Sequence, residues 1–228
     1  SARQNTLAMW LAQPHFVNVF LGRLNSFVAD NKLGDGKNIG EKTTIASQNI
    51  VRKIRPETGK NTQQIAASMR TEEQVGLLAG IDVFTMPTKV SKPAREKLEP
   101  NFSDKTSTDY DVSFYDGVDP VKTTVTKLWE VSEREYELGR SLNHDVPSSG
   151  EEVAQRAREM GCADMFPELS DRDSKTIAED GKIAVYSHWK ERILSGEIAV
   201  DTLQNMAGLA SFEADQKALD KRVRDLIS

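Results

Sequence analysis

Two arginines and a serine stand where apolar runs of the sequence end, and their side chains offer the chemistry of an anion site. Arg23 follows the apolar run 16–21, and Ser68 and Arg70 follow the short run 65–67. A planar guanidinium offers paired donors to phosphate oxygens, and a hydroxyl adds a further donor. An arginine in such a position is more often a rim residue held by a salt bridge, so a ligand role has to rest on both arginines together.

The elements that must position these side chains alternate along the first 99 residues. We predict buried strands near 15–22, 63–69 and 81–86. A polar, Gly-rich loop is expected over 25–42, and a helix over 45–54 that ends before Pro56. Thr71 and Gln74 form a capping-box pattern for a short helix before the third strand. Alternating strands and helices are typical of a parallel sheet, whose ligands bind at the carboxyl ends of the strands.

The character of the sequence changes after the third predicted strand. A long connection without clear period covers 95–120. Beyond it, apolar spacing predicts helices over 121–142, 151–160 (capped by Ser148 or Ser149), 183–194 and 212–227, with a shorter apolar segment over 198–206. Asp171 and Asp173 are expected to cap a helix start. We therefore predict two parts, residues 1–99 with the strands and residues 100–228 as a helical extension.

Composition excludes several classes of protein. A net charge of -5 over 228 residues argues against a nucleic-acid partner, because phosphate-backbone affinity needs an excess of Lys and Arg. No apolar run is long enough for a membrane span, and a single cysteine, Cys162, fits packing in a reducing cytoplasm. The three histidines, at 15, 144 and 188, are too far apart in sequence to predict a metal site. The chain opens on helix-like spacing without an initiator Met, which suggests a piece of a longer protein.

Three stretches of the sequence resemble motifs of the transaldolase family of Schiff-base aldolases. The sixth-strand motif of that family, S-P-F-V-G-R, is approximated by Asn18–Arg23, and the seventh, G-A-S-F-R-N, by Ala66–Thr71. The eighth, L-A-G-x-D followed by an apolar strand, is approximated by Leu78–Pro87. The similarity covers Ala2–Arg95. It implies an α/β fold in which residues 1–99 are the last three strands of a (β/α)8 TIM-type barrel.

The resemblance also implies roles for five residues. Arg23, Ser68 and Arg70 correspond to the residues that hold the phosphate of the sugar substrate. Asn18 and Phe20 correspond to active-site lining. Asn18 replaces a serine, and Phe20 stands where related fructose 6-phosphate aldolases typically have tyrosine, which favours transaldolase chemistry.

No catalytic residue is expected in this chain. The Schiff-base lysine of the family lies on the fourth strand, before the region of similarity. Lys89 and Lys92 follow the eighth strand, match no motif and are expected to be solvated. The chain alone is therefore expected to be inactive, with the N-terminal half of the barrel supplied by the same gene or by a separate chain.

The function implied is that of a transferase in carbohydrate metabolism. It would move a dihydroxyacetone unit between phosphorylated sugars of the pentose phosphate pathway through a lysine Schiff base, without a metal or organic cofactor. A cytoplasmic location is expected, and a homo-oligomer is left open. Two alternatives are a fructose 6-phosphate aldolase of the same family and a non-catalytic phosphosugar-binding or interaction module.

Overall fold

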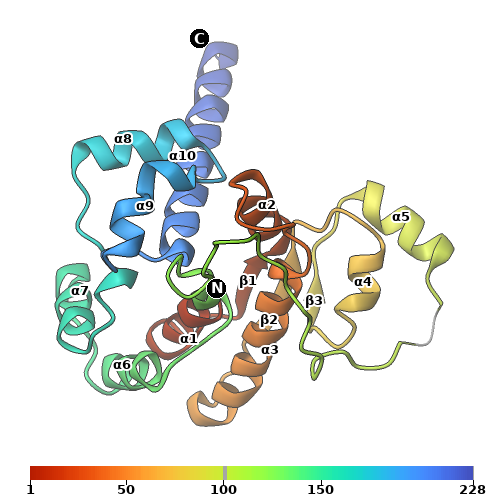
Figure 1. Cartoon of the computed structure of the whole chain (residues 1–228), viewed down its shortest axis with the longest axis horizontal. Helices are drawn as coiled ribbons and strands as arrows, with labels where there is room; N and C mark the ends of the chain where they lie inside the picture. Colours follow the sequence, from red (N-terminus) through yellow and green to blue (C-terminus); the bar gives the residue numbers. More distant parts are fainter. Residues whose placement is uncertain (100–101, 228) are drawn as a thin grey trace.

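The computed structural model describes residues 1–99 and 102–227, which form an α/β structure with a small parallel sheet among many helices (Figure 1). The strands are β1 (Phe16–Phe20), β2 (Gln63–Ala67) and β3 (Val83–Phe84), in the order β1-β2-β3. The helices are α1 (Ala2–Leu11), α2 (Leu21–Asp30), α3 (Ile39–Thr58), α4 (Glu73–Leu77), α5 (Thr88–Lys97), α6 (Glu133–His144), α7 (Gly150–Glu159), α8 (Asp171–Asp180), α9 (Tyr186–Leu194) and α10 (Val200–Ile227), with 3₁₀ turns η1 (Val125–Leu128) and η2 (Ala163–Met165). The predicted α/β class is confirmed, whereas the full barrel stays a prediction.

All three predicted strands form, and each is shorter than its predicted range. The parallel register pairs Phe20 with Ala67, so β1 and β2 end side by side. Along β1 the burial alternates: Val17 and Val19 are buried, whereas Asn18 on the opposite face is exposed. This alternation is the period of two that a strand imposes on its side chains.

The predicted loop 25–42 is wrong at both ends, because α2 starts directly after β1 and continues to Asp30, and α3 begins at Ile39. Leu24, Phe27 and Val28 lie three and four residues apart and are all buried, which is the spacing of one helix face. The polar residues between them had masked this pattern. One consequence for the site is that Arg23 lies in the first turn of α2 instead of on the strand.

Two further helices in this half depart from the sequence prediction. α3 continues through Pro56, which falls in its last turn, and ends at Gly59, whose φ is 66°. A proline in the last turn removes one hydrogen bond to the carbonyl four residues earlier, and this loss alone does not stop the helix. α5 had not been predicted at all, and it follows Pro87 directly.

In the second half, one predicted helix is divided in the structure, and two predicted segments are joined into one helix. The predicted helix 121–142 is wrong: η1 ends before a short break, and α6 begins after Ser132, which forms a capping box with Glu135. The segments 198–206 and 212–227 form one continuous helix, α10. α7 begins after the predicted cap Ser149, and α8 begins at Asp171 after Ser170, which forms a capping box with Asp173.

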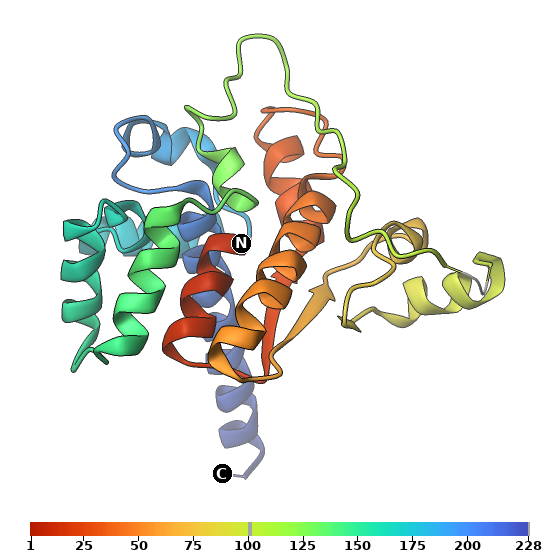
Figure 2. The same ribbon diagram turned by 90° about the horizontal axis from the view of Figure 1, so that it is seen from below.

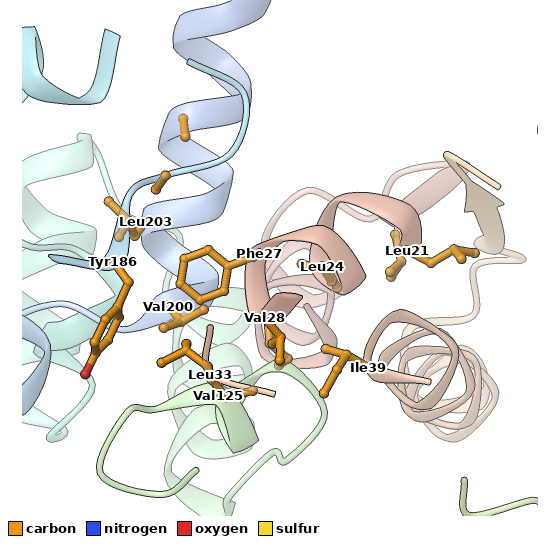
Figure 3. Packing of buried hydrophobic residues seen from close by; sticks show 14 of the residues in the cluster. Leu21, Leu24, Phe27, Val28, Leu33, Ile39, Val125, Tyr186, Val200 and Leu203 are labelled. Atoms are coloured by element: carbon orange, nitrogen blue, oxygen red, sulfur yellow. The ribbon is translucent and has the colours of Figure 1, made fainter. Parts of the chain in front are cut away.

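The main hydrophobic core joins elements from both predicted parts. Figure 3 shows Phe27 of α2 against Val200 and Leu203 of α10, with Tyr186 of α9 and Val125 of η1 around them. Residues 100 and 101, beside the predicted boundary of the two parts, lie outside the described residues. The helical extension therefore packs directly on the element that carries Arg23.

A buried arginine in the first helix ties several helices together. Arg3 is 1% exposed, and its guanidinium donates to Asp201 of α10 at 2.8 and 3.0 Å, to Asp164 of η2 at 2.9 Å and to Glu135 of α6 at 3.2 Å. Burial lowers the pKa of Arg3, but attraction by Asp201 and Asp164 outweighs it and raises that pKa overall. Burial likewise raises the pKa of Asp201, but the charge and hydrogen bonds of Arg3 outweigh it and hold that pKa below its ordinary value.

The last turns of α10 extend past the rest of the molecule (Figure 2). Leu219, Leu226 and Ile227 on these turns are more than half exposed. Within residues 1–99 and 102–227, no helix combines the length and the apolar character needed to cross a membrane.

We expect Arg3→Met to lower the free energy of unfolding by roughly 3–5 kcal/mol, because it leaves buried carboxylates without their counter-charge. Lys217→Met is the matched control, since Lys217 pairs with Glu213 on the exposed part of α10. Urea unfolding at neutral pH measures both. A loss for Arg3→Met as small as that of the control would show that the cluster does not hold the helices together.

Candidate functional site

The ends of β1 and β2 converge on Gly22, in the first turn of α2. A methyl group added to Gly22 would lie 2.8 Å from Nε of Arg70 and 3.2 Å from Oγ of Ser68, and it would overlap the carbonyl oxygen of Ser68. Ser68 itself has a φ of 63°, in the left-handed region that few residues other than glycine adopt. The structure therefore brings Ser68 and Arg70 together against the start of α2, as strand ends in a parallel sheet predict.

The loop that carries Arg70 is held by the side chain of Gln74. Its Oε1 accepts from the backbone N–H of Arg70 at 2.7 Å and from that of Thr71 at 3.3 Å. Its Nε2 donates to the buried carboxylate of Glu41 at 2.6 Å. Half of the predicted capping box thus forms, although α4 begins only at Glu73.

Glu41 is a supporting residue that the sequence analysis missed. Besides Gln74, it accepts a hydrogen bond of 3.0 Å from the Asn25 amide, whose oxygen in turn accepts from the N–H of Gly40 at 2.6 Å. These contacts connect α2, α3 and the Arg70 loop. A lone glutamate in a helix carries no sequence signal of such a role, since most glutamates of that kind are solvated.

Arg23 takes a different position from Arg70. Its guanidinium lies over the rings of Phe20 and Phe212, 4.8 and 4.9 Å from their centroids. Burial lowers the pKa of Arg23, with the charge of Asp215 acting against it, and arginine remains a cation throughout the physiological range. Phe212, on α10, was not predicted to reach the site, because only the tertiary fold brings it to Phe20.

Neither arginine forms a salt bridge within the described part of the chain. Arg70 is exposed, and Arg23 is half-buried. This observation speaks against the rim interpretation, in which a carboxylate of the protein would neutralise each guanidinium. It leaves two guanidinium groups, Arg70 against Gly22 and Arg23 against Gly208, without a paired carboxylate in the described residues.

A cleft of about 420 Å³ lies between α1, β1 and α10, next to Arg23. It is lined by Ser1, Gln4, Asn5, Ala8, Asn18, Val19, Phe20, Arg23, Leu24, Leu128, Asp201, Gln204, Asn205, Gly208, Leu209 and Phe212. The predicted lining residues Asn18 and Phe20 are among them, whereas Ser68 and Arg70 are not. The structure thus places the predicted residues on two sides of Gly22, with Arg23, Asn18 and Phe20 facing the cleft.

None of the lysines in the described part of the chain is buried. Lys89 and Lys92, on α5, are both exposed. A Schiff base needs an amine that is desolvated and therefore partly neutral. Within residues 1–99 and 102–227 there is also no group of three or more His, Cys, Asp or Glu side chains that could hold a metal ion.

Comparisons with known proteins leave the function to be argued from this geometry. No protein-family model matches the chain. No curated protein and no solved structure matches it either.

We expect Gly22→Ala to lower the free energy of unfolding by roughly 1–3 kcal/mol, because the added methyl group overlaps a backbone oxygen that cannot move away alone. Gly150→Ala, at the start of α7, is the matched control, since a methyl group there meets no atom within 4 Å. Thermal or urea unfolding compares the two variants. Equal stability would contradict the close approach of β2 to α2.

We expect Ser68→Gly to raise stability by about 1 kcal/mol, because glycine removes the strain of a left-handed backbone. Ser68→Ala is the control, since alanine also loses the hydroxyl but keeps the strain, and it should not raise stability. A Ser68→Gly protein that is less stable than the original would mean that the side chain is needed for the fold.

Proposed function

We propose that this chain binds the phosphate group of a phosphorylated sugar at the carboxyl ends of β1 and β2. The observation that carries the proposal is that neither Arg70, which lies beside Ser68 at Gly22, nor Arg23, which faces the cleft, has a salt-bridge partner in the described residues. The proposal requires the two guanidinium groups to turn toward a common phosphate across Gly22, where with the hydroxyl of Ser68 they would match its oxygens. Such a local site is compatible with a net charge of -5 for the whole chain.

The start of α2 supports the same ligand. Its N-cap residue, Phe20, provides no side-chain hydrogen bond to the first turn. The first backbone N–H groups of a helix have no partner within the helix, and they favour an anion together with the helix dipole. Gly22, in this first turn, lies against the loop that carries Ser68.

Within this proposal, the chain is the phosphate-binding part of a transaldolase-like transferase. The three motifs that resemble the family stand in order along the three strands of the sheet, as the C-terminal part of a (β/α)8 barrel would have them. The enzyme would transfer a dihydroxyacetone unit between phosphorylated sugars in the cytoplasm. Its Schiff-base lysine would come from other barrel strands, of the same gene product or of a separate chain.

A second candidate function is phosphosugar binding without catalysis. The exposure of Lys89 and Lys92 favours it for this chain taken alone, because neither amine is desolvated. Aldolase chemistry has less support, since Phe20 brings no hydroxyl to the cleft and its ring instead lies against Arg23.

We expect Arg70→Ala to weaken binding of fructose 6-phosphate to the chain by roughly ten- to a hundredfold, the loss of a charge-assisted contact. Binding of fructose, which carries no phosphate, should not change. Arg70→Lys should recover part of the affinity, because an ammonium keeps the charge without the planar fork. Isothermal titration calorimetry measures the affinity of the original protein and of the two variants for each sugar.

The matched control is Arg172→Ala, which removes an exposed arginine of α8 far along the chain from the site. It should bind fructose 6-phosphate like the original protein. If both variants weaken binding of fructose 6-phosphate equally, the effect comes from the loss of net positive charge and not from a contact of Arg70. If Arg70→Ala binds as the original does, the phosphate assignment is wrong.

A further inference from the structure

One side chain in the cleft has hydrogen-bonding groups that the described protein leaves unused. Gln204 of α10 is 8% exposed and lines the cleft. Neither its Nε2 nor its Oε1 has a hydrogen-bond partner among the described residues. The other buried side chains with this property, Trp10, Tyr136 and Thr202, do not line the cleft.

An unsatisfied buried amide is costly, so its position next to a cleft points to a ligand. Leaving one buried donor or acceptor unpaired costs about 1–3 kcal/mol, and Gln204 leaves both. Its neighbour Gln4 shows the contrast, because the amide of Gln4 donates to the backbone oxygen of Asp201 at 3.2 Å. Gln204 thus holds a donor and an acceptor without partners in the wall of the cleft, and because both atoms are covered, a rotation of the side chain has to bring them to a ligand.

The position of Gln204 relative to Arg23 indicates what kind of ligand would use both. A methyl group added to Gly208 would lie 3.1 Å from an η nitrogen of Arg23, so the guanidinium rests on that turn of α10. Gln204 lies four residues earlier, about one helical turn or about 6 Å along the axis, on the same face. A ligand anchored at Arg23 by its anionic group can therefore reach Gln204 with the next part of its structure.

The remaining lining favours a polyhydroxylated ligand over an apolar one. A hydroxyl both donates and accepts, so it can satisfy the two halves of a carboxamide. Asn18 and Asn205 add further carboxamides to the cleft, and both are exposed to it or to solvent. Phe20 and Phe212 offer aromatic faces beside Arg23.

We infer that Gln204 is a specificity-determining residue that hydrogen-bonds the hydroxyl groups of a phosphorylated sugar whose phosphate is held at Arg23. The inference rests on the proposed function for the position of the phosphate. It adds that α10, from the helical half of the chain, binds the hydroxyl groups of the sugar. Affinity for the sugar phosphate then exceeds affinity for phosphate alone through Gln204.

The experiment titrates inorganic phosphate and fructose 6-phosphate separately into the original protein, Gln204→Leu and the control Gln216→Leu. Gln216 lies on the exposed part of the same helix, where it donates to Asp220. We expect Gln204→Leu to bind fructose 6-phosphate about tenfold more weakly, the effect of losing two hydrogen bonds. Its affinity for inorganic phosphate should stay that of the original protein, and Gln216→Leu should match the original for both ligands.

A thermal melt of the same variants without ligand gives a second readout. Because leucine is similar in size and carries no unsatisfied polar atoms, Gln204→Leu should melt at a higher temperature than the original protein. A residue kept only for the fold would lower the melting temperature when replaced. Higher stability together with lost sugar affinity is the combined result that a binding role predicts.

Each other outcome overturns the inference. If the original protein binds both ligands and Gln204→Leu binds them equally well, Gln204 has no role, while the proposed phosphate site stands. If the original protein binds neither ligand, the phosphate site and the role of Gln204 fail together. If Gln204→Leu loses affinity for inorganic phosphate as well, the residue acts on Arg23 or on the fold instead of on the sugar.

Discussion

The buried guanidinium of Arg3 is the interaction on which the arrangement of the helices depends. It binds carboxylates from α6, η2 and α10 at once, and α1 supplies it. A buried ion pair is stable only if its geometry satisfies the hydrogen-bond donors and acceptors of both charges. The three carboxylates that satisfy Arg3 all come from segments distant in the sequence. Because α1 and α10 also line the cleft, the ion cluster joins two of its walls.

The site itself is shaped by a second constraint, the close approach of the end of β2 to the start of α2. Gly22 leaves room for Ser68 and Arg70, and the left-handed backbone of Ser68 turns the chain at the end of β2. Both features cost conformational freedom or strain. Together they place Arg70, which has no paired carboxylate in the described chain, against the first turn of α2. The first backbone N–H groups of a helix favour a bound anion.

Sequence patterns predicted the sheet better than the helices around it. The three apolar runs became β1, β2 and β3 because burial on a parallel sheet needs a nearly continuous apolar segment. α2 was missed and 121–142 was wrongly joined, because helix boundaries depend on packing partners that local spacing does not reveal. Pro56 illustrates the reverse error, since it lies within a helix whose packing outweighs the local preference.

The sequence by itself determined that Arg23, Ser68 and Arg70 would follow strands, and hence that strand ends would gather them on one edge of a sheet. Only the tertiary structure decided that Arg23 faces the cleft while Arg70 lies on the other side of Gly22. It alone brought Phe212 and Gln204 to the same place from almost two hundred residues away. The physical reason is that a strand end is specified by local apolar runs, whereas the wall opposite it is specified by core packing and the buried charge of Arg3, which act between distant segments.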